Sequence, residues 1–412
     1  MTTLITNIKL LVNTRESNVL LRGKALAELP CIEDAYLLIE DGIMAAYGEM
    51  NALPAVDRRP STEIDAKGAT VLPAWCDSHT HLVFAASREE EFVYKLKGMS
   101  YAEIAAKGGG ILNSAAKINA MSETELFNIS RQRLQEVIKL GTGAIEIKSG
   151  YGLSVEGELK MLRVIQRLKQ ESPIPIKATF LGAHTYPLQF KNDHQGYIDM
   201  IIDEMLPVIA TEKLADYIDV FCEEGFFSAK ETEVICNAGM KYGLKPKIHA
   251  NQLNLSNGVQ TGVKLNAVSV DHLETMNEDA IQTLASSDTI GTLLPTAAFF
   301  LRMSYQPARR LIESGCAIAL ATDYNPGSSP SGNMNFVVAL SCIQMKMLPE
   351  EAINAATING AYAMELQDEV GSISIGKKAN LIFTKPISSL AYLPYSFGSN
   401  LIDKVMINGE FV

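Results

Sequence analysis

The 412-residue sequence lacks any uninterrupted apolar stretch of about 18 residues, the length that a membrane-spanning helix requires. It has no long run of basic residues, and its formal net charge is −11. A protein that binds a phosphate backbone needs clustered cations, so we expect no nucleic-acid partner. The N-terminal segment MTTLITNIKLLVNTRES has no basic region followed by a continuous apolar core, so we also expect no secretory signal.

Cysteine and histidine are both scarce. The six cysteines are scattered without a CxxC pair, which predicts free thiols in a reducing compartment and a cytoplasmic location. Cys76 lies beside the most reactive-looking motif of the chain, and we interpret it as a buried, inert thiol. The six histidines are few enough that their positions are informative.

The two ends of the chain resemble each other and differ from the middle. Both contain short alternating runs broken by glycine, with hairpin signals at Asp41-Gly42 and Asn408-Gly409. We therefore predict that residues 1–68 and 369–412 together form one small β-sandwich domain.

The middle, residues 69–368, alternates β-rich runs with helical stretches. The expected strands are 71–79, 143–149, 176–183, 217–223, 245–251, 267–273, 289–295 and 317–323. Two expected helices are SETELFNISRQRLQEVIKLG, which opens with a serine cap, and VEGELKMLRVIQRLKQE. Eight such units predict an α/β fold of the (β/α)8 TIM barrel type. A doubly wound open sheet is the alternative, but no GxGxxG follows the first strand.

Five of the six histidines fall in or just after expected strands. The motif DSHTHL supplies His79 and His81, and the other three are His184, His249 and His272. The eighth strand, AIALATD, ends in Asp323. Because active sites of TIM barrels lie at the carboxyl ends of the strands, these residues predict one clustered site. A lone histidine is more often structural, but this recurrence on separate strands favours a site.

Imidazoles combined with a carboxylate are typical of a transition-metal site with zinc as the first choice, and iron and manganese as alternatives. Such a metal lowers the pKa of bound water towards about 7 and polarises a carbonyl oxygen, which indicates hydrolysis or deamination. A non-catalytic metal-binding module is the competing class. It would not need a barrel mouth lined with additional bases.

These motifs resemble the amidohydrolase superfamily: DSHTH after strand 1, histidines on strands 5 and 6, an aspartate ending strand 8, and a small β domain from both termini. Within it, the chain resembles the imidazolonepropionase family over nearly its full length. The matching segments are GGGILNSAAK (108–117), IEIKSGYGL (145–153), FLGAHTYP (180–187) and ATDYNPGSSP (321–330). Two positions depart from the superfamily pattern: Ala74-Trp75 replaces a Pro-Gly-aliphatic turn, and Asn380 stands where aspartate is common.

The resemblance implies hydrolysis of the cyclic amide 4-imidazolone-5-propanoate to N-formimino-L-glutamate in histidine degradation, by a metal-bound water. It implies the metal ligands His79, His81, His249 and Asp323. Two-metal relatives use a carbamylated lysine near strand 4, but that strand here ends Phe221-Cys222-Glu223. We therefore expect one divalent metal, zinc or iron. A deaminase of heterocyclic amines on the same scaffold is the alternative function.

Position 252 bears on the proton transfers. Deaminating relatives carry a glutamate three residues after the strand-5 histidine, whereas this chain has Gln252, which does not titrate. Gln252 can orient the substrate but cannot be a general acid or base. We therefore expect His272 to act as base or to polarise the carbonyl, and Asp323 to pass a proton to the leaving nitrogen. A supporting role or a further metal ligand is the alternative for His272.

The substrate's propanoate tail requires a cation, and Arg88 matches the carboxylate-binding arginine of the family. The resemblance also implies substrate contacts for Tyr151 and His184, and we expect Tyr101 to reach the same site. Asn325, Gly327 and Ser328 follow Asp323 and are expected to bind substrate or product through their backbone donors and hydroxyls. Glu146 and Lys148 are expected to point into the barrel without a catalytic role. The resemblance is compatible with a homodimer, although no residue indicates one.

Overall fold

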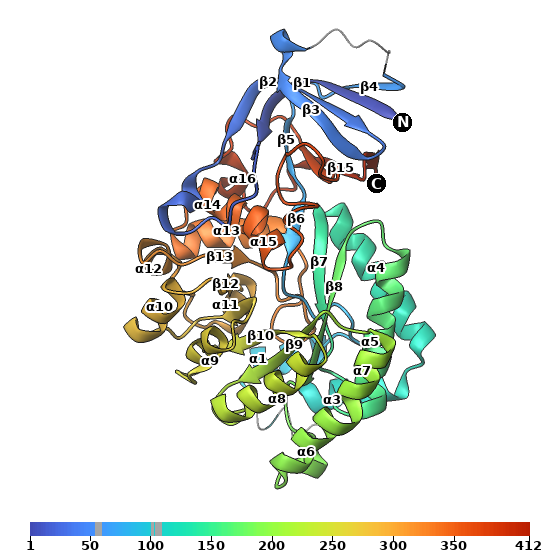
Figure 1. Ribbon diagram of the computed structural model, residues 1–412, viewed down its shortest axis with the longest axis vertical. Coiled ribbons are helices and arrows are strands. Elements are labelled where there is room, and N and C mark those ends of the chain that lie inside the picture. The colour runs from blue at the N-terminus through green and yellow to red at the C-terminus, as the bar shows by residue number, and fades with distance from the viewer. Residues whose placement is uncertain (54–59, 100–102, 104–108) are drawn as a thin grey trace.

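The computed structural model describes residues 1–53, 60–99, 103 and 109–412, and it consists of a small sheet placed above a barrel (Figure 1). The small sheet has the order β16-β15-β14-β5-β1-β2-β3, with β4 paired to β1. It is mixed, because β1 runs parallel to β4 and β5 but antiparallel to β2. Its strands are β1 (Thr2–Val12), β2 (Cys31–Glu40), β3 (Ile43–Glu49), β4 (Thr62–Asp65), β5 (Thr70–Pro73), β14 (Leu381–Thr384), β15 (Ile402–Ile407) and β16 (Glu410–Phe411).

Both hairpin predictions are confirmed. Asp41 and Gly42 join β2 to β3 with φ values of 48° and 81°, and Asn408 and Gly409 join β15 to β16 with 49° and 81°. Two successive residues with positive φ form the turn that matches strand twist in a two-residue hairpin. The two chain ends meet in this sheet, as expected; the domain boundaries themselves stay a prediction.

The second sheet confirms the predicted barrel architecture. Eight strands pair in parallel in the sequential order β6 to β13. They are β6 (Trp75–Asp77), β7 (Thr142–Lys148), β8 (Ile176–Ala183), β9 (Tyr217–Cys222), β10 (Lys245–Ala250), β11 (Ser269–His272), β12 (Ile290–Leu293) and β13 (Ile318–Leu320). The small sheet lies at their amino ends, so their carboxyl ends face away from it (Figure 1).

Helices surround the barrel. They are α1 (Glu89–Leu96), α3 (Ile111–Ala120), α4 (Glu123–Lys139), α5 (Val155–Glu171), α6 (His194–Met200), α7 (Leu206–Glu212), α8 (Ala229–Lys241), α9 (Gly258–Lys264), α10 (Glu278–Ala285), α11 (Pro295–Leu301), α12 (Ala308–Glu313), α13 (Met334–Met345), α14 (Pro349–Ala356), α15 (Ile358–Tyr362) and α16 (Tyr392–Tyr395). A π-helical segment, Ile201–Met205, joins α6 to α7. The predicted cap of α4 is confirmed, since Ser122 and Glu125 form a reciprocal capping box.

One predicted strand, 71–79, is divided between the two sheets. Its first part belongs to β5 of the small sheet, and its second part is β6 of the barrel. Pro73 has no N–H to continue a ladder, and the Ala74 N–H donates to the Asn380 carbonyl instead. The chain therefore passes from one sheet to the other here, and His79 lies beyond the strand rather than in it.

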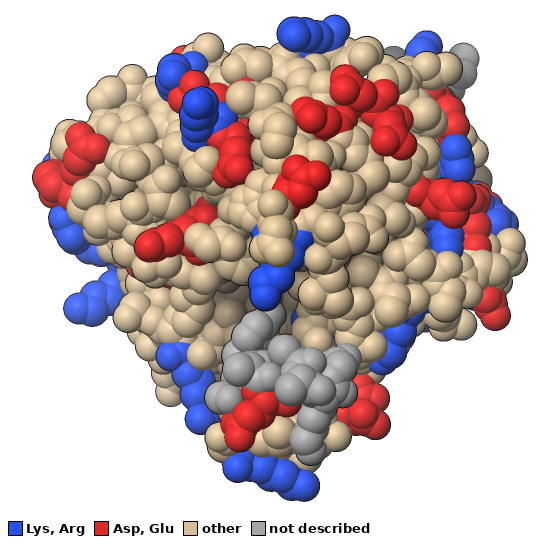
Figure 2. All heavy atoms as spheres, turned by 90° about the horizontal axis from the view of Figure 1, so that it is seen from below, with Lys and Arg blue, Asp and Glu red and all other residues tan. Residues whose placement is uncertain are grey.

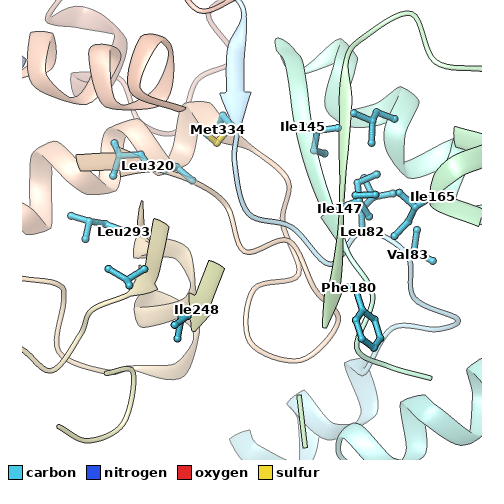
Figure 3. Close-up of a cluster of buried hydrophobic side chains, with 14 of the residues drawn as sticks. Leu82, Val83, Ile145, Ile147, Ile165, Phe180, Ile248, Leu293, Leu320 and Met334 are labelled. Atoms are coloured by element: carbon cyan, nitrogen blue, oxygen red, sulfur yellow. The ribbon is translucent and has the colours of Figure 1, made fainter. Parts of the chain in front are cut away.

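The barrel strands place apolar residues outside and charged residues inside. Ile145 and Ile147 of β7 face the surrounding helices, where Ile165 of α5 lies beside them (Figure 3). Between them in sequence, Glu146 and Lys148 are fully buried and face the barrel interior, as expected. Asp219 of β9, Lys247 of β10 and Asp271 of β11 are also buried charged residues, so aliphatic packing surrounds a charged centre.

Across the described residues, we find no helix with the length and apolar character needed to cross a membrane.

Asn380 connects the two sheets. Its side-chain Nδ2 donates to the Gly143 carbonyl at the start of β7, and its Oδ1 accepts from the Asn408 N–H. The side chain is 4% exposed. An aspartate would place a carboxylate oxygen against the Gly143 carbonyl, so the departure from the superfamily pattern has a structural reason.

We expect Asn380→Asp to lower the free energy of unfolding by about 1–3 kcal/mol, because a buried donor is replaced by a second acceptor. Urea titration would measure it. The matched control is Asn400→Asp, since the Asn400 Oδ1 already serves as an acceptor for the Ile402 N–H; we expect a change of less than about 0.5 kcal/mol there. Equal stability of the two variants would contradict this role.

Candidate metal centre and active site

The barrel closes at the place where the candidate ligands meet. Beyond the ends of β6 and β13, the Asp323 N–H donates to the His79 carbonyl at 3.0 Å, and the His81 N–H donates to the Tyr324 carbonyl at 2.9 Å. Thr322 adds two hydrogen bonds to the Asp77 carboxylate. These bonds bring the DSHTHL motif of the first strand beside the aspartate of the eighth.

The four predicted ligands lie together at this seam. His81 Nε2 is 3.4 Å from His249 Nε2, and Asp323 Oδ1 is 3.5 Å from the Nε2 atoms of both His79 and His81. No side chain of the four is more than 3% exposed. His79, His81 and His249 form one potential metal-ligand group, and His79, His272 and Asp323 form another. Their binding of an ion stays a prediction.

The protonation state of these rings suits a metal. Burial, followed by repulsion from Lys148 and from the other imidazoles, lowers the pKa of His79, His81 and His249 well below its ordinary value. Neutral rings keep a lone pair for coordination. The buried His79 Nε2 has no hydrogen-bond partner among the described residues, which is the condition of a nitrogen that faces an ion. Several imidazoles with one carboxylate fit a borderline divalent metal.

Carboxylates on β9 and β11 lie behind two of the rings. Asp271 Oδ2 lies 2.7 Å from His79 Nδ1, and Asp219 Oδ2 lies 3.0 Å from His249 Nδ1. Lys148 in turn contacts both carboxylates, at 2.8 Å for Asp219 and 3.5 Å for Asp271. Burial lowers the pKa of Lys148, but these acidic neighbours outweigh burial and raise that pKa above its ordinary value.

Sequence reasoning missed the supporting roles of Asp219, Asp271 and Lys148. Asp219 and Asp271 each follow an aliphatic residue within a short strand, in YIDVF and in SVDH. A carboxylate at an inward position of such a strand was the sequence feature that could have indicated these supporting roles.

His272 reaches the site through an unusual backbone. In a regular strand it would point opposite to its neighbour Asp271, which faces the barrel interior. However, His272 and Leu273 have φ values of 86° and 66°, a region that costs non-glycine residues about 1–3 kcal/mol each. This turn places His272 against His249, with ring centroids 5.1 Å apart. Strain of this kind commonly marks a functional position.

Glu274 supports His272 and was also missed. Its Oε1 lies 3.5 Å from His272 Nδ1 and accepts a hydrogen bond from Gln306 at 3.0 Å. Burial is the largest single influence and lowers the pKa of His272, but Glu274, Asp323 and Asp271 together outweigh it and raise that pKa above its ordinary value. His272 Nε2 is left as the nitrogen available to a substrate or a water molecule.

A cavity of about 510 Å³ opens from the histidine cluster, and Arg88 lines it. Arg88 Nε donates to Ser114 Oγ at 2.9 Å, while its buried Nη2 has no partner among the described residues. Gly327 makes room for this guanidinium, because a Cβ there would lie 2.6 Å from Arg88 Nη1. An unpaired buried guanidinium nitrogen is suited to binding an anion.

Three other residues predicted to contact the substrate lie in the wall of this cavity. Tyr151, His184 and Gln252 all line the cavity, and the His184 ring stacks on His81 with centroids 5.3 Å apart. Tyr101 lies outside the described residues, as do residues 100, 102 and 104–108.

Asn325, Gly327 and Ser328 of the turn after Asp323 line the same cavity, and their contact with substrate stays a prediction. The N–H groups of Gly327 and Ser328 both donate to Asn325 Oδ1 at 2.8 Å, and Ser328 Oγ donates to Asp323 Oδ2 at 3.3 Å. Asn325 folds the turn onto itself, as asparagine does when it bonds the backbone two residues ahead. This segment therefore holds Asp323 in place, and the N–H groups of Gly327 and Ser328 already have an acceptor in this structure.

Comparison with known proteins places the chain among metal-dependent hydrolases. Residues 70–412 match the model of the Amidohydrolase family, and the chain belongs to that family. Its fold is similar to that of E. coli guanine deaminase (TM-score 0.73, 13% identity, covering 100% of this chain and 99% of the other). It is also similar to a zinc-bound adenosine deaminase of Xanthomonas campestris (TM-score 0.71, 15% identity, covering 99% and 92%). At these identities the likeness shows the fold alone.

Curated relatives give a finer assignment. The chain is 58% identical over 413 residues to a protein of Flavobacterium johnsoniae named Imidazolonepropionase, with both chains covered completely. A protein of Alkaliphilus metalliredigens with the same name is 39% identical over 412 residues, covering 99% of this chain and 97% of the relative. The chain is therefore a member of the imidazolonepropionase family.

We expect His249→Ala to purify with only a small fraction of the wild-type metal content, because one of four ligands is removed from a buried site. Elemental analysis of the purified protein measures this directly. His194→Ala is the matched control, since His194 of α6 stacks on Tyr186 and lies outside the cluster. A His249→Ala protein that keeps the full metal content would show that the ion binds elsewhere.

Proposed function

We propose that this chain hydrolyses 4-imidazolone-5-propanoate to N-formimino-L-glutamate, with one divalent metal, zinc or iron, held by His79, His81, His249 and Asp323. One observation supports the proposal: a buried imidazole and carboxylate cluster opens into the same cavity as a guanidinium nitrogen of Arg88 that has no partner within the described part of the chain. The substrate has a hydrolysable ring at one end and a carboxylate at the other, and the cavity offers one partner for each.

The guanidinium anchors the propanoate tail. Arg88 is held by Ser114 and lies 5.7 Å from the centre of the Tyr151 ring, so its position in the cavity wall is fixed. Two parallel hydrogen bonds from one guanidinium to a carboxylate fix orientation as well as position. His184 and Gln252, on the cavity wall, would then contact the imidazolone ring, where an amide can both donate and accept.

The chemistry needs an activated water and a place for two protons. A divalent ion at the cluster would supply the Lewis acidity that lowers the pKa of water to about 7. His272 takes a proton from the attacking water at Nε2, and the Glu274 carboxylate behind Nδ1 stabilises the charged ring. Asp323 receives the second proton of that water as the carboxyl group forms and passes it to the leaving ring nitrogen, whose bond to the carbonyl carbon breaks. Ser328 and the closing hydrogen bonds hold this carboxylate towards the cluster.

We also propose a small-molecule substrate, and the charge on the surface around the barrel mouth agrees with it. Basic and acidic side chains are interspersed over the face opposite the small sheet (Figure 2).

We further propose a cytoplasmic location. The six cysteines are free thiols, which supports that location.

One assay separates the proposed reaction from deamination. Metal-loaded protein is incubated with 4-imidazolone-5-propanoate while imidazolone absorbance and free ammonia are followed together. We expect absorbance to fall without ammonia release, because the ring amide is opened and no amine is lost. Ammonia release from nucleobases, with the imidazolone left intact, would support the deaminase and contradict our proposal. Activity on neither substrate would also contradict it.

We expect His272→Ala to keep its metal while kcat falls by about 100- to 10,000-fold, the usual contribution of a positioned acid or base. Elemental analysis and steady-state kinetics on one preparation test both parts. If the variant loses its metal and added zinc restores catalysis, His272 is a ligand and its role as base is wrong.

A further inference from the structure

Lys148 occupies the centre of the barrel, directly behind the histidine cluster. Its Nζ lies 2.6 Å from Glu146 Oε1, 2.8 Å from Asp219 Oδ2 and 3.5 Å from Asp271 Oδ2. All four side chains are completely buried. An ammonium in this position has three donors and no lone pair, so it cannot itself bind a metal.

The same two carboxylate oxygens touch the ligand rings. Asp271 Oδ2 is 2.7 Å from His79 Nδ1, and Asp219 Oδ2 is 3.0 Å from His249 Nδ1. Asp219 also accepts the His249 backbone N–H through its other oxygen, at 3.1 Å. One ammonium therefore sits between two oxygens, each of which contacts a different imidazole of the proposed metal site.

We propose that Lys148 is a positioning residue that sets the tautomer and the direction of His79 and His249 together. Because Lys148 only donates, it holds Asp219 and Asp271 as acceptors. Asp271 then accepts the Nδ1–H of His79. Asp219 Oδ2 lies 3.0 Å from His249 Nδ1 without forming a hydrogen bond in this structure, and we extend the same tautomer to His249 from that proximity. Both Nε2 atoms are thereby left with a lone pair and face the same point. This inference rests on the metal site of the proposed function, but not on the identity of the substrate.

A purely structural role for Lys148 is the competing explanation, and the chain contains a matched control. Lys247 is equally buried and is bound to the same Glu146. Its remaining hydrogen bonds go to the backbone carbonyls of Ser78 and Ala363. Lys247→Met therefore removes a buried ammonium of the same kind without removing the one that bridges Asp219 and Asp271.

The test measures zinc affinity and ring tautomers, not turnover. Apo forms of the wild type, Lys148→Met and Lys247→Met are titrated with zinc against a chromophoric chelator, and their thermal unfolding is recorded. We expect Lys148→Met to lose 10- to 100-fold in zinc affinity, about the loss found when a group supporting a metal ligand is removed. We expect Lys247→Met to stay within about threefold of the wild type even if both variants unfold at lower temperature. Equal affinity losses in the two lysine variants, or none in Lys148→Met, would overturn the proposal.

The wild type alone provides a second test if Lys148→Met does not fold. Nitrogen NMR of histidine-labelled apo protein reports which ring nitrogen carries the proton. We expect Nδ1–H for His79 and His249, and the Nε2–H form at either ring would overturn the proposal. Failure of the imidazolone assay would leave both readouts unchanged, so the two proposals fail separately.

Discussion

The network of charges inside the barrel is the constraint on which the site depends. Glu146, Asp219 and Asp271 share two ammonium groups, those of Lys148 and Lys247. Three carboxylates against two ammoniums leave one formal negative charge directly beneath the imidazoles, which favours a cation there. Removing one member of such a buried network leaves an uncompensated charge and costs about 3–5 kcal/mol, so the network is rigid as well as polar. This rigidity gives the ligand rings fixed supports.

The remaining parts of the site are placed by the way the barrel closes. Backbone hydrogen bonds between the segments after β6 and β13 bring His79 and His81 beside Asp323, and the turn held by Asn325 supports that aspartate. The left-handed backbone at His272 turns one further imidazole into the mouth. The proposed metal ligands thus lie on a barrel strand or on segments that hydrogen bonds hold at the barrel seam. The position of the proposed base, in contrast, depends on a strained turn.

Much of this architecture could be predicted from the sequence, because the spacing of apolar residues along a strand or helix indicates which of its faces is buried. Each of the eight expected barrel strands overlaps an observed one, and helix α5, Val155–Glu171, has the bounds of the expected segment. Division of the first strand at Pro73 was missed, since the partner of the Ala74 N–H, Asn380, is more than 300 residues away. Recurrence of histidine at strand ends was enough to predict which side chains cluster.

The sequence did not reveal how those side chains are held. Lys148 was correctly expected to point into the barrel, but its contacts with Asp219 and Asp271 depend on how the inward side chains of the alternate strands β7, β9 and β11 meet in the barrel interior. The direction of His272 depends on a positive φ that no propensity of histidine or leucine predicts. The donors after Asp323 looked free in the sequence and are taken up by Asn325 in the fold.

The most direct test of this account is a crystal structure of metal-loaded protein with anomalous data at the metal edge. The account predicts one anomalous peak per chain, with the Nε2 atoms of His79, His81 and His249 and a carboxylate oxygen of Asp323 at about 2.0–2.2 Å. A peak away from these four atoms, or two ions of equal occupancy in the barrel mouth, would contradict it.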